Sequence, residues 1–141
     1  MRQILLLAML LSVKGLYSQS NNWEIVYQSS ALNIYSNYTE CHDVANGIHK
    51  EKVLLKFENL TNQDLELSYS REMWYDDRCL GCEENASEYT YTINLSPYES
   101  KAGDCATKDK TWYIFSKFLN RKTAELSRFE IKDVNIKNIE E

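Results

Sequence analysis

Apolar and polar residues alternate with a period of two along most of the chain. The clearest segment is 89–95, where tyrosine, isoleucine and leucine at odd positions alternate with threonine and asparagine at even ones. Such alternation places one face of a strand against a core and the other in water, as in antiparallel sheets. The same pattern predicts further strands over 23–27, 32–38, 53–57, 65–75, 112–119 and 129–136.

Three segments need a closer look. Helical spacing of some apolar residues competes with strand alternation over 112–119, but aromatic and β-branched residues there favour a strand. The apolar parity slips by one within 129–136, which predicts a β-bulge near Lys132 and Asp133. The polar segment 59–63 joins two alternating runs and is predicted to form a hairpin connection.

About seven strands with no alternating helices predict an all-β fold, a two-sheet antiparallel β-sandwich. An Ig-like strand order is the expected arrangement for seven strands, although the Cys, Trp and Cys pattern of immunoglobulin domains is not matched. We expect one domain over residues 21–137 and a charged, frayed tail at 138–141.

The N-terminus adds a prediction about location. Arg2 precedes an apolar run over 4–11, and Ser18 and Ser20 stand where a signal peptidase reads small residues. The run is too short to cross a bilayer, which takes about 20 residues. We therefore expect residues 1–20 to be a cleavable signal peptide, and the mature chain to be secreted or periplasmic with no membrane span.

Charge narrows the classes of partner. The formal net charge is -5 for 141 residues, and it becomes -7 when Arg2 and Lys14 leave with the signal peptide. Nucleic acids and anionic membranes reward clusters of lysine and arginine, so an acidic chain argues against both. No cofactor is expected.

Four cysteines in an exported chain predict two disulfides. The expected strand directions favour Cys41 pairing with Cys79 or Cys82, which leaves Cys105 for the remaining one. The alternative joins Cys79 to Cys82 and Cys41 to Cys105. The C-x2-C spacing also leaves a metal site as a second hypothesis, with Cys41, His42, Cys79, Cys82 and Cys105 as ligands.

No nucleophile elbow, zincin helix or phosphate-binding glycine loop occurs in the sequence, so we do not expect an enzyme. Loops on a rigid scaffold commonly carry recognition. We therefore expect a non-catalytic binding protein that contacts a protein or glycan through the loops 76–84 and 96–110. The candidate contact residues are aromatic or acidic and lie near these loops: Trp74, Tyr75, Asp76, Asp77 and Tyr113.

Overall fold

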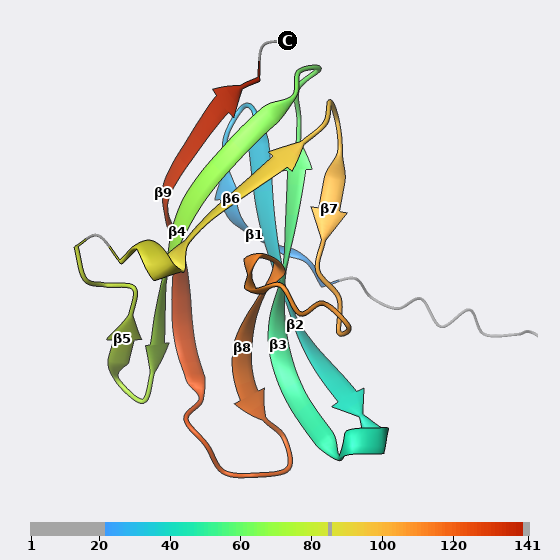
Figure 1. Ribbon diagram of the computed structural model, residues 1–141, viewed down its shortest axis with the longest axis vertical. Helices are drawn as coiled ribbons and strands as arrows, with labels where there is room; N and C mark the ends of the chain where they lie inside the picture. The colour runs from blue at the N-terminus through green and yellow to red at the C-terminus, as the bar shows by residue number, and fades with distance from the viewer. Residues whose placement is uncertain (1–21, 85, 140–141) are drawn as a thin grey trace, which may run out of the picture.

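The structure, a computed structural model, describes residues 22–84 and 86–139, so the predicted signal peptide lies outside it. Within the described residues, nine strands and three short 3-10 helices form two antiparallel sheets that pack face to face (Figure 1). The predicted β-sandwich is confirmed. The structure has two strands more than the seven predicted. Each of these two has only three residues, too few for alternation to reveal it.

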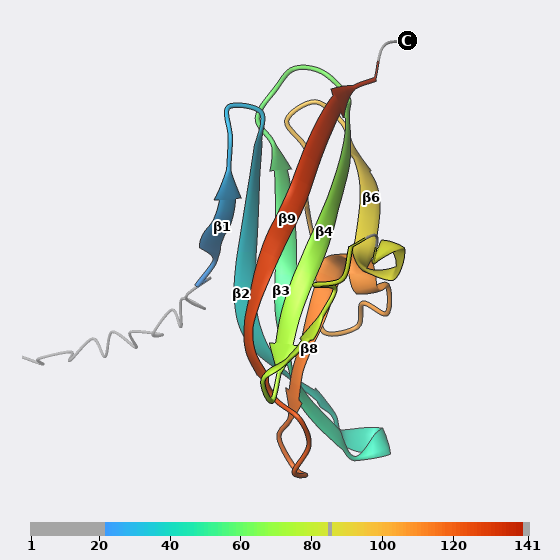
Figure 2. The same cartoon turned by 90° about the vertical axis from the view of Figure 1, so that its left-hand side faces the viewer.

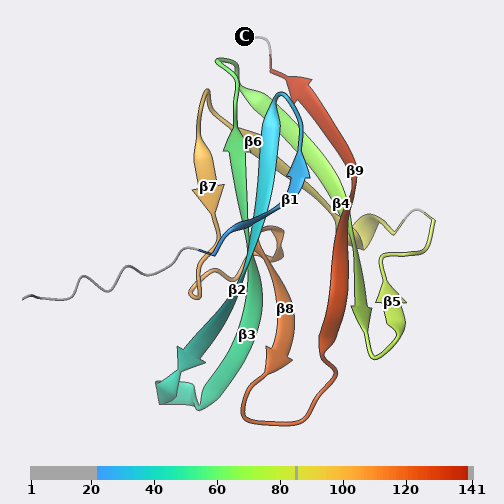
Figure 3. The same cartoon turned by 180° about the vertical axis from the view of Figure 1, so that it is seen from behind.

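The first sheet contains five strands, which are β1 (Glu24–Gln28), β2 (Leu32–Asp43), β3 (Ile48–Asn59), β7 (Ser100–Ala102) and β8 (Tyr113–Phe118). β2 pairs along its whole length with β3, while β1 covers only the first part of β2 (Figure 3). β7 and β8 pair with different parts of β3, so they lie end to end along its other edge.

The second sheet contains four strands, which are β4 (Leu65–Tyr75), β5 (Arg78–Leu80), β6 (Thr90–Leu95) and β9 (Leu126–Asn138). β4 is central, with β9 along one edge and with β5 and β6 sharing the other (Figure 2). The 3-10 helices lie in the connections, and they are η1 (Val44–Asn46), η2 (Ser87–Tyr89) and η3 (Lys110–Trp112).

The core lies between the inward faces of the two sheets. Its main cluster draws on β2, β3, β4 and β6 and consists of Leu32, Ile34, Leu55, Phe57, Leu67, Tyr69, Ile93 and Leu95. Arg71 continues the inward face of β4 and is 1% exposed, and Lys52 of β3 is 2% exposed. Buried cations need hydrogen-bonding partners in place of water, so both side chains must have acceptors within the protein.

The predicted hairpin at 59–63 is wrong, because this segment crosses from β3 in the first sheet to β4 in the second. The buried side chain of Asn59 holds the crossing in place. Its Nδ2 donates to the carbonyls of Gln63 (2.7 Å) and Ser96 (2.9 Å), and its Oδ1 accepts from the Thr61 N–H (2.8 Å). One asparagine therefore ties together both connections that cross between the sheets at this end.

The last strand shows the predicted bulge, which is confirmed. Asp133 and Val134 of β9 together face a single residue of β4, and Asp133 has a φ of 49°. Its carboxylate accepts from the Ser70 hydroxyl at 2.7 Å. β9 runs through residue 138, and the N–H of Ile139 donates to the Asp64 carbonyl (2.9 Å), so the first two residues of the expected tail are bonded to the sheet.

The Ig-like strand order is not confirmed. In the Ig constant-type sandwich the second strand lies between the first and the fifth. Here β2 lies between β1 and β3, its neighbours along the chain. The first sheet thus begins as a consecutive meander, and the later strands are shared between the two sheets.

Candidate functional site

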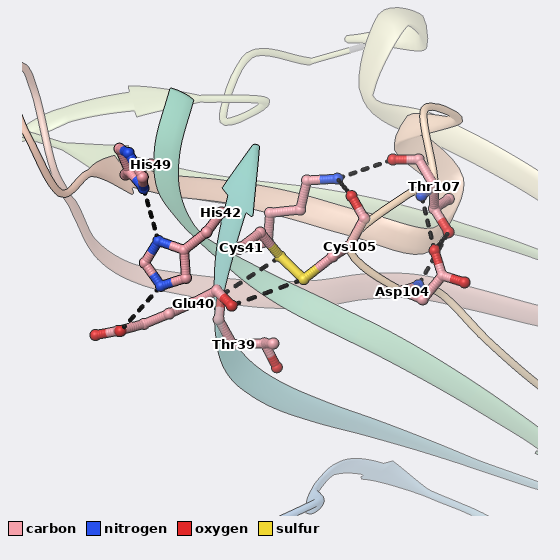
Figure 4. Close-up of a disulfide and its surroundings, with 9 residues drawn as sticks. Thr39, Glu40, Cys41, His42, His49, Asp104, Cys105 and Thr107 are labelled. Carbon is pink, nitrogen blue, oxygen red and sulfur yellow. Dashed lines mark hydrogen bonds and ion pairs between the residues drawn. A yellow bond between two sulfur atoms is a disulfide. The ribbon is translucent and has the colours of Figure 1, made fainter. Parts of the chain in front are cut away.

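The cysteines form two disulfides, Cys41–Cys105 and Cys79–Cys82, with Cα atoms 5.4 and 5.8 Å apart. The favoured pairing of Cys41 with Cys79 or Cys82 is therefore wrong, and the alternative is present. β7 pairs with β3, so the connection that follows it stays on the first sheet and brings Cys105 to β2 (Figure 4). Cys79 lies on β5, in the other sheet.

The hypothesis of a metal site built on the cysteines loses its thiolate ligands to these disulfides. In the described ranges no three His, Cys, Asp or Glu side chains gather around a common point. His42 instead faces its cross-strand partner His49, with the two Nδ1 atoms 2.8 Å apart (Figure 4). Its Nε2 lies 3.6 Å from a carboxylate oxygen of Glu40. This exposed pair belongs to the β2–β3 hairpin.

The connection from residue 103 to 109 is fastened to the first sheet by Lys52 as well as by the disulfide. The Lys52 ammonium donates to the carbonyls of Cys105 (3.2 Å) and Thr107 (2.8 Å) and lies 3.9 Å from the centre of the Tyr113 ring. Burial, with a smaller contribution from Lys50, lowers the pKa of Lys52. These contacts fix the start of β8, which follows the connection.

A cavity of about 860 Å³ opens where β4, β5 and β6 of the second sheet approach β8 of the first. Tyr75, Asp76 and Tyr113 of the predicted contact residues line it, whereas Trp74 and Asp77 do not. Its lining is rich in aromatic and aliphatic side chains, and the full set is Arg71, Met73, Tyr75, Asp76, Arg78, Leu80, Glu88, Tyr89, Tyr91, Lys110, Tyr113, Ile114, Phe115, Thr123 and Ala124. Its size lies within the range of small-molecule sites.

Arg71 is the functional candidate that the sequence analysis missed. Its Nη1 donates to the Tyr113 carbonyl (3.0 Å) and its Nη2 to the Lys110 carbonyl (2.6 Å). The guanidinium carbon lies 3.7 Å from the centre of the Tyr91 ring, a cation–π contact. The Nε is buried and has no hydrogen-bond partner. The alternation of 65–75 was the available signal, because it places residue 71 on the inward face.

Two tyrosines of β4 continue this pattern of bonds to the edge of β8. The Tyr69 hydroxyl donates to the Thr111 carbonyl (2.7 Å), and the Tyr75 hydroxyl donates to the Phe115 carbonyl. With Arg71, three β4 side chains thus bond alternate carbonyls of the segment 111–115. Burial raises the pKa of both tyrosines, that of Tyr75 to about 12. These bonds hold β8 against β4 and set the depth of the cavity.

The wall of the cavity on the β5 side depends on a tight turn. Asp76 and Asp77 have φ values of 46° and 64°, so both residues of the two-residue β4–β5 loop are left-handed, as in a type I′ hairpin turn. Gly81, with a φ of 85°, follows β5, and a Cβ there would overlap the Arg71 carbonyl oxygen and press on the Tyr89 ring. The 79–82 disulfide joins β5, which is paired with β4, to the turn that follows it.

Trp74 and the two predicted loops differ from expectation. Trp74 lies half-buried on the outer face of the second sheet, where the Arg128 guanidinium covers its ring at 3.8 Å. The predicted loops 76–84 and 96–110 are interrupted by β5 and β7. The binding candidates are therefore strand residues around the cavity more than loop residues.

Comparisons with known proteins do not indicate a family or a function for this chain. No protein-family model, curated protein or solved structure matches it. Within 22–84 and 86–139, no helix is long and apolar enough to cross a membrane. The function must therefore be argued from the cavity and the residues around it.

Proposed function

We propose that the protein is exported and non-catalytic, and that it binds a protein or glycan partner in the cavity between β4, β5, β6 and β8. The observation that carries this proposal is the cavity itself, with its aromatic lining and with the hydrogen-bonded side chains of Arg71 and Tyr75 among its lining residues. Concave, largely apolar sites with a few fixed polar groups are the usual form of binding sites.

Export is supported by two independent features. The first 20 residues have the pattern of a signal peptide, and the two disulfides suit an oxidising compartment. A secreted or periplasmic location follows. Disulfides stabilise a small domain mainly by constraining its unfolded chain, which suits a binding scaffold outside the cytoplasm.

The absence of catalysis is supported by the chemistry of the lining. None of the cavity-lining residues is a histidine, serine or cysteine, the groups that most often act as base or nucleophile. His42 and His49 bond to each other on the exposed β2–β3 hairpin instead. The lining offers aromatic faces, carboxylates and cations, which are groups that hold a ligand in place.

The test compares three forms of the purified mature protein. Ala124 is exposed at the cavity, so Ala124→Trp should block it, while Ala45→Trp adds the same side chain at the exposed β2–β3 turn. We expect the wild type and Ala45→Trp to retain a partner from a glycan array or from the exported proteins of the producing cells, and Ala124→Trp to lose it. If all three forms retain the same amount of partner, the partner does not bind in the cavity. If the partner is recovered with an altered mass, the protein is catalytic.

A further inference from the structure

We infer that the group recognised in this cavity is a carboxylate carried on an apolar body, and that Arg71 holds it. The inference rests on the proposed function, because it names the ligand chemistry of the same site. The C-terminus of a protein or peptide partner supplies such a group; a free organic acid presents the same chemistry to the guanidinium, and the test below separates the two sources.

The guanidinium of Arg71 has unused donors inside the protein. It carries five N–H donors, and its hydrogen bonds run to the carbonyls of Tyr113 and Lys110. Its Nε–H is buried without a partner, and leaving such a donor unpaired destabilises the folded protein. A carboxylate accepts from the Nε–H and a neighbouring Nη–H together, in the bidentate geometry that arginine favours.

The charge of Arg71 also lacks a paired anion. No carboxylate of the described residues forms an ion pair with it, and its two acceptors are neutral carbonyls. Asp76 and Glu88 line the same cavity but form no ion pair with Arg71. The Arg71 charge acts on Asp109, whose carboxylate accepts from the Thr111 N–H at 2.8 Å and so is committed to the start of η3. A buried cation in this state favours an incoming anion more strongly than a surface arginine does.

The cavity is lined by Arg71 and by the residues around its guanidinium. Tyr91, Lys110 and Tyr113, which contact the guanidinium through ring or carbonyl, all line the cavity together with Arg71 itself. The rest of the lining is largely apolar, including Met73, Leu80, Ile114 and Phe115. A ligand that fits both the guanidinium and the apolar lining has an anionic end, which contacts Arg71, and an apolar body, which contacts the other lining residues.

The test begins with the unaltered protein and two probes of the same shape. Benzoate and benzamide differ in charge but share the ring, and amide chemical shifts report where each one binds. We expect benzoate to shift the amides of cavity-lining residues saturably and at least tenfold more tightly than benzamide. A peptide ending in phenylalanine is then compared with its C-terminally amidated form. If the peptide with the free carboxylate binds at least tenfold more tightly, the C-terminus of a chain can supply the carboxylate.

Variants then identify the group responsible. Arg71→Gln should abolish the preference for benzoate, while Arg128→Gln, a matched change on the outer face of the second sheet and away from the cavity, should keep it. Equal binding of benzoate and benzamide within the cavity would overturn the carboxylate inference and leave the proposed site standing. Failure of every probe to shift the lining residues would also overturn the carboxylate inference, whereas the proposed site is tested separately by Ala124→Trp. Because the comparison of probes uses the unaltered chain, an Arg71→Gln protein that fails to fold does not remove the test.

Discussion

Replacing Cys41 and Cys105 by alanine should destabilise the fold about twice as much as replacing Cys79 and Cys82. Each double variant removes one disulfide and leaves the other in place. The reason is the length of chain that each bond closes. The bond Cys41–Cys105 spans a separation of 64 residues, whereas Cys79–Cys82 spans 3.

The magnitudes follow from the entropy of closing a loop in the unfolded chain. A separation of 64 residues corresponds to about 4.3 kcal/mol of stabilisation, and a separation of 3 corresponds to about 2 kcal/mol. Losing the long-range bond also releases the connection 103–109 from β2, which leaves the Lys52 hydrogen bonds as its main anchor. We therefore expect faster amide exchange over 103–113 in that variant.

Urea unfolding without reductant measures the free energy of unfolding of each variant, and hydrogen exchange locates the loosened segment. The predicted result is a loss larger by about 2 kcal/mol for the long-range pair, with exchange increased mainly over 103–113. Equal losses would refute the loop-closure reasoning. A larger loss for the Cys79 and Cys82 variant would show that the 79–82 loop, and not the connection to β2, dominates stability.

Three further changes probe the packing around the cavity. The free energy of unfolding should fall above pH 10, because the Tyr75 pKa is raised to about 12 and between these values its phenol stays protonated only in the folded chain. This contribution to stability is present below pH 10 and is lost as the pH rises to 12. Tyr75→Phe should reduce the fall, as measured by urea unfolding at each pH, and an unchanged pH profile would contradict the assignment. Gly81→Ala should cost more than about 1 kcal/mol, because its φ of 85° and the Arg71 carbonyl leave no room for a Cβ, and a neutral result in thermal unfolding would count against that contact. Lys52→Met should cost about 1–3 kcal/mol by leaving the Cys105 and Thr107 carbonyls unpaired, and an unchanged urea midpoint would show that water replaces the ammonium.

The sequence predicts which face of each strand is buried better than it predicts which strands are neighbours. Alternation correctly identified the core face of β4, although Arg71 on that face was overlooked because it is charged, and the slip in parity identified the bulge at Asp133. Alternation carries no information on the partner of a strand. The crossing at 59–63 therefore resembled a hairpin, since a short polar connection between two alternating runs fits either geometry.

The cavity and the disulfide pairing depend on elements that leave little trace in the sequence. β7 has three residues, yet its pairing with β3 keeps the following connection on the first sheet and decides the partner of Cys105. The cavity combines residues from four strands, from η2 and η3 and from the β8–β9 connection, which are separated along the chain. Tyr75 and Tyr113 could be singled out as aromatic residues, but their meeting at one site depends on the packing of β8 against β4.

A single peptide map of the mature protein, digested with trypsin without reduction, tests both the removal of the signal peptide and the pairing of the two disulfides. Cleavage after lysine and arginine places Cys41, Cys105 and the Cys79–Cys82 pair in three different peptides, ending at Lys50, Lys108 and Lys101. We expect the Cys41 peptide to begin at residue 21 and to be joined to the Cys105 peptide. The 79–101 peptide should be lighter by two hydrogens because of its own disulfide. A bond between the Cys41 and 79–101 peptides, or four free thiols, would contradict it.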